Sequence, residues 1–479
     1  MNSQSAWQTT LSFFPDLPVV VEPIDAHLTS DAGLLLFREF DEQRGLTAAF
    51  AAALSDPRRA ASIDHPYLQM VRARVYGILA DYEDQNDHDT LRTDAAFKLI
   101  AGRSPDGPDL ASQPTLSRFE NSVDIASLNR LREVQIDQFI AGFHEAPSSL
   151  TFDIDCFDDP AHGQQQLVFF HGFYEQYQYL PRVITCAEND ETVLVQLLYG
   201  TASPELGADD DLRHLVQRLR EVWPDVKIHV RGDSGFGKPV MYRVCEELRV
   251  EYSFGLGMNP VLKRNSEDLL NQAVSEYEKQ GQPQRLFTGF SYAAQSWDQE
   301  RYVVVKAEAN AQGTNRRAVV TNRPGAPHFP QGAYDEYADR GESENRNKEL
   351  KRGLCGDRLS DHRFMANFFR LYMHALALNI LVGMRRLVAA PPPEPRVAEI
   401  PLEAATPYAK RSYANRRRKE DPLGEGHACT WRTRLIKVAA QIVVTTRRVW
   451  IRLSGSWPHL EHFRKVAETI VATFSRGTG

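Results

Sequence analysis

The stretch SLTFDIDCF, residues 149–157, decides the fold class of this chain. Its apolar and polar residues alternate, which is typical of a β-strand with one buried face. Further strand-like segments follow, then the amphipathic helix ADDDLRHLVQRLREVW, and then VKIHVRGDSGF, a strand that ends at Asp233. Strands, a helix and a further strand in this order predict an α/β core.

The segments on either side of this core differ from it in composition. Residues 1–147 are rich in helical patterns, and residues 250–324 are mainly strand-like with one helix, NSEDLLNQAVSEYEKQ. The chain therefore divides into six predicted parts: a helical N-terminal domain at 1–147, the first part of the core at 148–249, a mainly β insertion at 250–324, the second part of the core at 325–388, a Pro-rich linker at 389–402, and a basic, largely helical C-terminal region at 403–479.

Composition places the chain among ordinary globular proteins. Hydrophobic residues make up 42% and charged residues 25% of its 479 residues. The five cysteines form no CxxC pair, which argues against a disulfide framework or a zinc cluster and fits a reducing, cytoplasmic setting. The start has no basic and apolar signal pattern. The most apolar segment, residues 364–384, contains Asn, Arg and His, so we expect a buried core helix and no membrane partner.

Charge is distributed unevenly along the chain. The net charge is −7, yet residues 401–465 hold fourteen Lys and Arg against five Asp and Glu. In YAKRSYANRRRK, residues 408–419, aromatic residues alternate with basic ones, which favours a nucleic-acid partner over a merely solubilising tail. The candidate contacts are Arg416, Arg417, Arg418 and Lys419. In the N-terminal part, SQPTLSRFEN suits a recognition helix carrying Arg118, although a structural helix fits it equally well.

A second charged segment, YADRGESENRNKELK, covers residues 337–351. With about 100° of rotation per residue in a helix, one narrow stripe holds Tyr337, Arg340, Glu344 and Lys351, whereas Glu342 and Glu349 fall on the opposite face. A stripe of this kind is usually a solvated helix face. Here it follows two strands with acids, so Glu344 becomes a candidate partner of those acids.

The acids on the two strands are candidates for metal binding. Asp153 and Asp155 lie two apart on one strand and share a face, and Asp233 ends the other. Clustered carboxylates are costly without cations, and oxygen ligands favour Mg²⁺ or Mn²⁺ over zinc. Two such ions about 4 Å apart can cleave or join a phosphodiester. Each acid alone also fits a turn or a surface role.

Together these motifs resemble the DDE transposases of insertion sequences. Tyr337, Arg340, Glu344 and Lys351 match the Y-(2)-R-(3)-E-(6)-K signature of one large group. The separated segments DIDCFDDPAHGQQ, YLPRVIT, VRGDSGFGKP, AVVTNRPG and DRLSDHRFMANFFRLYMHALA resemble insertion-sequence family 1380. The resemblance implies an RNase H-like catalytic core within the α/β fold. It assigns the catalytic and metal-binding roles to Asp155, Asp233 and Glu344, with two Mg²⁺ or Mn²⁺ ions. Asp153 remains the alternative first acid, because Phe157 stands where related enzymes have Thr.

The resemblance also implies an activity and its partners. The enzyme would cut double-stranded DNA at terminal inverted repeats and join the ends to target DNA, as a homodimer in the DNA complex. It would act in the cytoplasm, on the nucleoid when DNA is bound. Tyr337, Arg340 and Lys351 would hold the DNA backbone, and Trp297 would stack on a flipped base unless it packs within the insertion. The alternatives are a nuclease without joining activity and a non-catalytic DNA-binding descendant.

Overall fold

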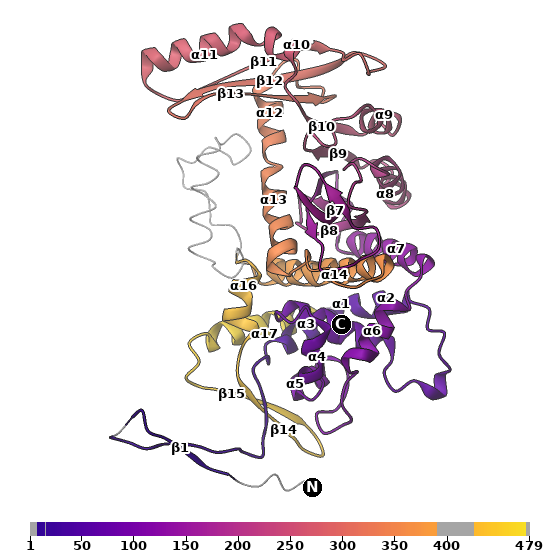
Figure 1. The fold of residues 1–479 in the computed structure, drawn as a ribbon, viewed down its shortest axis with the longest axis vertical. Helices are drawn as coiled ribbons and strands as arrows, with labels where there is room; N and C mark the ends of the chain where they lie inside the picture. Colours follow the sequence, from indigo (N-terminus) through magenta and orange to yellow (C-terminus); the bar gives the residue numbers. More distant parts are fainter. Residues whose placement is uncertain (1–6, 15, 390–425, 476–479) are drawn as a thin grey trace.

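The computed structural model describes residues 7–14, 16–389 and 426–475, and its centre is a ten-stranded mixed sheet (Figure 1). Its strands run in the order β11-β12-β13-β10-β9-β4-β7-β5, and β6 and β8 also pair with β7. Their bounds are β4 (Ser149–Cys156), β5 (Asp159–Pro160), β6 (Phe169–His171), β7 (Gln176–Cys186), β8 (Thr192–Leu198), β9 (Lys227–Gly232), β10 (Glu251–Leu256), β11 (Gln284–Tyr292), β12 (Arg301–Asn310) and β13 (Gly313–Thr321). The predicted α/β class is confirmed.

Parallel pairing of β4 with β9 sets the position of the acids. Ile154 lies opposite Gly232, so both strands end at the same edge of the sheet. β7 runs antiparallel to β4 on its other side. The face away from the acids is covered by α7 (Ile125–Ala141), α8 (Ala208–Val222) and α9 (Pro239–Glu247). α8 buries Leu212, Leu215 and Leu219, the three-to-four spacing of an amphipathic helix.

The strand-rich segment after β10 extends the same sheet. β13 pairs antiparallel with β10, which in turn lies parallel to β9. The strands and the helix that the sequence predicts here are present, and α11 (Glu267–Gln280) packs on β11 and β12, preceded by α10 (Pro260–Asn265). Figure 1 shows this part at one end of the long axis of the molecule. Its sheet is therefore continuous with that of the core.

Three consecutive helical segments follow β13 and connect the sheet to the helical part. They are α12 (Pro330–Ala338), α13 (Gly341–Lys348) and the π-helical turn η3 (Glu349–Gly353). The long helix α14 (Phe364–Val388) then runs between the sheet and the N-terminal helices (Figure 1). It is the one helix in the described part of the chain that is apolar and long enough to cross a membrane, and 89% of its most apolar window is buried inside the protein. This burial agrees with the predicted core helix.

The helical part contains both ends of the described chain. Its N-terminal elements are β1 (Thr9–Leu11), β2 (Val19–Val21), β3 (His27–Thr29), α1 (Leu34–Arg44), α2 (Leu46–Ala52), η1 (Ala60–Ser62), α3 (Tyr67–Leu79), η2 (Gln85–Asp87), α4 (His88–Leu91), α5 (Ala95–Ile100) and α6 (Gln113–Asn121). The C-terminal elements are α16 (Ala428–Trp431), η5 (Arg432–Ile436), β14 (Ala440–Val444), β15 (Val449–Leu453) and α17 (Leu460–Ser475).

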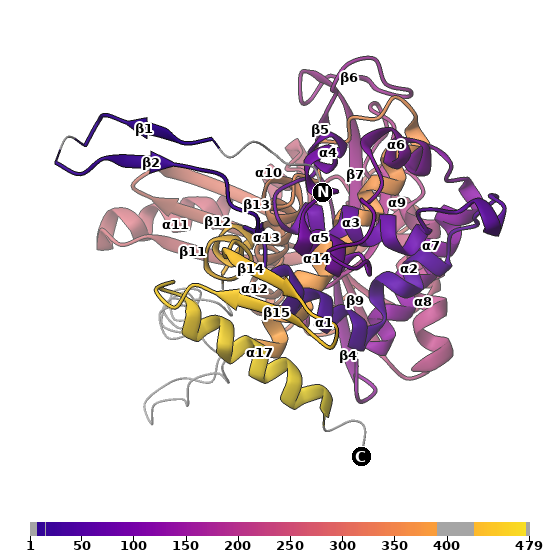
Figure 2. The same ribbon diagram turned by 90° about the horizontal axis from the view of Figure 1, so that it is seen from below.

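The C-terminal elements pack into the N-terminal helical core. β14 pairs with β3, and the fully buried Trp431 ring lies 5.9 Å from that of Phe37. Figure 2 shows β14, β15 and α17 beside α1. The sequence predicts a mainly helical C-terminal region, whereas the part described from residue 426 on also contains a β-hairpin. The predicted Pro-rich linker from residue 390 on and the basic cluster at 416–419 lie outside the described residues.

Candidate active site

Asp155 lies at the end of β4, where the sheet edge meets α13. Its Oδ2 accepts hydrogen bonds from Arg340 Nη1 at 3.3 Å and from Asn347 Nδ2 at 3.1 Å. Its Oδ1 accepts from the backbone N–H of Cys156 at 2.8 Å. The side chain is 17% exposed, so one approach to the carboxylate remains open.

Burial and the surrounding charges shift the pKa of Asp155. Burial raises the pKa of Asp155 from 3.8 to about 6. The positive charge of Arg340 opposes this shift, while the negative charges of Asp233 and Glu344 add to it. A carboxylate that is buried near two like charges is stabilised by any cation that reaches it.

Asp233 follows β9 directly, in a tight turn beside β10. Its Oδ1 accepts from the backbone N–H of Gly235 at 2.9 Å. Gly255 of β10 approaches this turn so closely that a Cβ there would lie 2.8 Å from the Tyr337 hydroxyl and 2.9 Å from the Ser234 nitrogen. Glycine at 255 therefore brings the Tyr337 hydroxyl next to the Asp233 turn.

Arg340 connects the first and third acids. Its Nη2 donates to Glu344 Oε1 at 3.1 Å, one helical turn away, while Nη1 contacts Asp155. The guanidinium carbon also lies 6.0 Å from the centre of the Tyr337 ring. Glu344 is half exposed, whereas Arg340 is only 13% exposed. A guanidinium thus lies between two carboxylates, where a positive charge is favoured.

The structure separates Asp153 from Asp155. Both side chains face the α12–α13 side of the sheet, as the alternation predicts. Arg231, which binds Asp153, also donates to the Glu336 carbonyl of α12 at 2.7 Å, and Asp155 accepts from Arg340 at the start of α13. Asp153 is 2% exposed and forms a two-pronged ion pair with Arg231, at 2.7 and 2.8 Å. Both of its oxygens are occupied inside the protein, so Asp153 has a structural partner and Asp155 faces the open edge.

Lys351 pairs with an acid outside the predicted three, Asp158. Its Nζ contacts Asp158 Oδ1, and Asp158 Oδ2 accepts from Gln176 Nε2 at 3.0 Å. Lys351 belongs to the π-helical turn η3, whose extra residue changes the helical register after Lys348. The stripe of the sequence analysis therefore holds through Glu344, and Lys351 reaches the loop after β4.

The other predicted DNA contacts lie elsewhere. Trp297 packs on Tyr242, Tyr292 and Arg301, with ring distances of 5.1 and 5.3 Å, so its contacts are those of a packed residue. Arg118 is exposed on α6 and donates to Thr115 Oγ1 at 3.1 Å. Arg416, Arg417, Arg418 and Lys419 lie outside the described residues.

The sequence analysis places Glu349 on the face opposite Glu344 and gives it no role, but the structure buries Glu349 against a distant helix that supplies its partner. Glu349 is 3% exposed, forms a two-pronged ion pair with Arg385 of α14, and accepts from the Ala428 backbone N–H at 2.7 Å. Glu342, by contrast, is exposed. Asn347 was missed, although its position three residues after Glu344 puts it near the same stripe.

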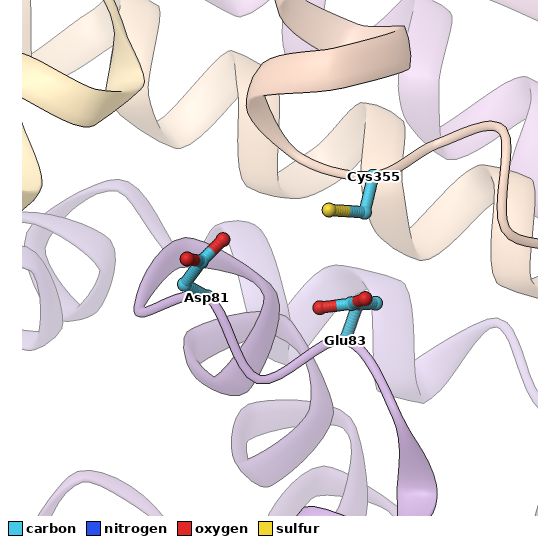
Figure 3. Close-up of side chains that lie close together, drawn as sticks. All are labelled: Asp81, Glu83 and Cys355. Atoms are coloured by element: carbon cyan, nitrogen blue, oxygen red, sulfur yellow. The ribbon is translucent and has the colours of Figure 1, made fainter.

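A second group of possible metal ligands lies away from these acids. Asp81, Glu83 and Cys355 are the one group in the described ranges whose three ligand atoms lie within 4.8 Å of one another (Figure 3). Arg432 pairs with Asp81 at 2.8 Å and Arg358 with Glu83, while burial raises the pKa of Cys355 to about 11. Both carboxylates thus already have cationic partners. Asp155, Asp233 and Glu344 are more widely spaced than this, with the Arg340 guanidinium between two of them.

The family described as Transposase DDE domain group 1 matches residues 16–399. A cryo-EM structure of a piggyBac transposase synaptic complex with hairpin DNA is similar over 92% of this chain and 85% of that chain, with 11% sequence identity and a TM-score of 0.39. No curated protein matches the chain.

Proposed function

The chain belongs to the family described as Transposase DDE domain group 1, and on that premise we propose that it cuts DNA at the ends of a mobile element and joins the freed ends to target DNA. One observation carries the proposal. Asp155 and Asp233 lie at the ends of two adjacent parallel strands. Glu344 of α13 is linked to Asp155 by Arg340, which donates a hydrogen bond to each of these two carboxylates.

The strand order supports an RNase H-like core. In the run β8-β7-β4-β9-β10, only β7 is antiparallel to the others. The three acids follow in the order strand, strand and helix, which is the order that the resemblance implies. We propose that the chain belongs to the Y-R-E-K signature group and resembles insertion-sequence family 1380, on the motifs quoted in the sequence analysis.

The side chains at the site fit a divalent cation. Members of the DDE transposase family generally use divalent metal ions. The donors are oxygens, which suit Mg²⁺ or Mn²⁺, and the bridging guanidinium of Arg340 marks a place where positive charge is favoured. Two ions held by Asp155, Asp233 and Glu344 would supply an activated water or 3′-hydroxyl and stabilise the leaving oxygen.

The residues around the acids orient the DNA. Arg340 is positioned to hold a phosphate at the scissile bond once it leaves its carboxylate partners, because charge-assisted contacts to phosphate are strong. The Tyr337 hydroxyl lies over the Asp233 turn and offers a second hydrogen bond. Arg118 and the basic cluster at 416–419 are proposed to contact DNA further from the cut. Cutting two ends together requires a homodimer on the DNA.

The test uses end DNA taken from the sequence that flanks the gene. Wild type should cut it with Mg²⁺ or Mn²⁺ and not with EDTA. Asp155→Asn, Asp233→Asn and Glu344→Gln should each abolish cutting and keep measurable DNA binding, while the exposed Glu342→Gln serves as the matched control. Full cutting by any of the three variants would contradict the assignment. A strand-transfer assay with a pre-cut end separates a transposase from a nuclease that does not join.

A further inference from the structure

The segment between β5 and β7 presents an aromatic surface that the proposed chemistry does not use. It comprises residues 169–177, formed by β6, its turn and the start of β7, and is called here the aromatic hairpin. Phe173 is 83% exposed, Tyr177 62% and Phe170 51%. Figure 2 shows β6 projecting from the edge of the molecule. Several exposed aromatic rings in one short hairpin indicate a binding surface.

Two ring pairs of the aromatic hairpin pack edge to face, and a third pair is tilted. The Phe173 and His171 rings each lie 5.0 Å from that of Tyr174, and Phe170 lies 5.5 Å from Tyr177. Edge-to-face packing leaves the flat faces of the outer rings free for another planar group. The exposed ring faces of the aromatic hairpin thus favour a flat aromatic ligand over an aliphatic one.

The aromatic hairpin lies beside the proposed active site. Gln176, in its second strand, donates to Asp158, the residue that pairs with Lys351. The negative charges of Asp158 and Asp155 also help burial to raise the pKa of the Tyr174 hydroxyl to about 12. A DNA end held at the acids would therefore pass next to these rings.

A hollow of about 330 Å³ adjoins the aromatic hairpin at Tyr177. Its lining includes Gln164, Gln166 and His362, and His362 Nδ1 contacts the Gln164 carbonyl at 2.8 Å. Amide and imidazole groups donate and accept hydrogen bonds, which is the chemistry that recognises the edges of nucleobases. The hollow thus combines an aromatic wall with polar groups.

A glycine holds the aromatic hairpin in place. Gly200, after β8, donates its N–H to the Leu167 carbonyl at 3.1 Å. A Cβ at this position would lie 2.2 Å from the Gln178 carbonyl oxygen and 2.6 Å from the Phe169 nitrogen. The close approach that only glycine permits fixes the first strand of the hairpin against the sheet, so its rings are preorganised.

We propose that the aromatic hairpin binds unpaired nucleobases of a DNA end, with Phe173 and Phe170 stacking on the bases. This inference rests on the proposed function, and it assigns the stacking role to residues other than Trp297. Base stacking on an aromatic side chain tolerates any sequence, because every base has a flat π-face. Loss of one stacking ring should therefore weaken binding of single-stranded DNA about 5- to 150-fold.

The test measures binding of the full chain in EDTA by fluorescence anisotropy, with labelled oligothymidylate and with a duplex of matched length. Phe173→Ala and Phe170→Ala should weaken oligothymidylate binding by that factor and leave duplex binding unchanged. Phe173→Trp should bind as wild type does. The matched control is Phe329→Ala, which removes a phenylalanine that is 63% exposed outside the hairpin.

Three results would overturn the inference. They are a wild type that does not bind oligothymidylate, hairpin variants that bind it normally, and hairpin variants that change the oligomeric mass in light scattering, which would make the surface a protein contact. Because no cleavage occurs in EDTA, this result is independent of the proposed chemistry. If wild type binds oligothymidylate through Phe173 but never cuts end DNA with Mg²⁺, the proposed function fails and the binding site stands.

Discussion

Replacing Asp155 by Asn should stabilise the metal-free protein at neutral pH. The folded state raises the pKa of this carboxyl from 3.8 to about 6. At 1.36 kcal/mol per pKa unit, keeping Asp155 ionised costs at most about 3 kcal/mol. Asp155→Asn removes this cost, but it also weakens the charge-assisted hydrogen bonds from Arg340 and Asn347. We therefore expect the free energy of unfolding of Asp155→Asn to exceed that of wild type by about 1–3 kcal/mol.

The sign of the effect depends on pH in a defined way. Below pH 3.8 the Asp155 carboxyl is protonated in both the folded and the unfolded state, so it carries no electrostatic cost. As pH rises through about 6, the folded protein must also ionise it, and the full cost appears. The advantage of Asp155→Asn should therefore grow between pH 4 and pH 6 and remain constant above.

Asp153→Asn is the matched variant, and it should have the opposite effect even though burial raises the pKa of Asp153 as well, because the Asp153 carboxylate has a dedicated buried partner in Arg231. It breaks a buried two-pronged ion pair and leaves Arg231 short of a partner, which costs roughly 3–5 kcal/mol. The assay is thermal unfolding of both variants and wild type at several pH values, with EDTA and then with Mg²⁺. Mg²⁺ should stabilise wild type and not Asp155→Asn. If Asp155→Asn were less stable than wild type at pH 7.5, or Asp153→Asn equally stable, the division of roles between the two acids would be refuted.

Three further predictions concern the charged helix and the basic cluster. Glu349→Gln should lower stability by about 3–5 kcal/mol in thermal unfolding, because it breaks a buried ion pair, whereas exposed Glu342→Gln should change it by less than about 0.5 kcal/mol. Tyr337→Phe should bind intact ends and cut them about 10- to 100-fold more slowly, with Arg340→Ala worse, while wild-type cutting by Tyr337→Phe would assign the ring to packing. Changing residues 416–419 to Ala in the full chain should make the slope of log affinity against log salt shallower by up to about 3.6, and an unchanged slope would leave the cluster as a solubilising tail.

The C-terminal variant is best made in the full chain. Removing everything after the Pro-rich linker would also remove Trp431, whose buried ring belongs to the same core as Phe37 and the α14 helix. Such a truncation would mix loss of DNA contacts with loss of folding stability. Substitution at 416–419 removes four positive charges and retains Trp431 and the rest of the described core.

The sequence alone determined the fold class, the strands that carry the acids and the family. Alternation in residues 149–157 fixes the strand and the shared face of Asp153 and Asp155, because a period of two is a property of the local backbone. The spacing of Tyr337, Arg340 and Glu344 fixes a helical stripe for the same reason, and the structure brings Arg340 and Glu344 together. Such patterns repeat within a few residues and need no knowledge of the rest of the chain.

Only the tertiary structure distinguished the surroundings of two acids that look equivalent in the sequence. Asp153 and Asp155 share a strand and a face, but Asp153 meets Arg231, 78 residues further along the chain, and is neutralised inside the protein. Glu349 likewise meets Arg385 of α14, and Trp297 meets Tyr242 of α9. In each case the role follows from a partner that packing brings from a distant segment. Local periodicity sets the direction of a side chain, whereas burial and ionic pairing depend on what the whole fold places against it.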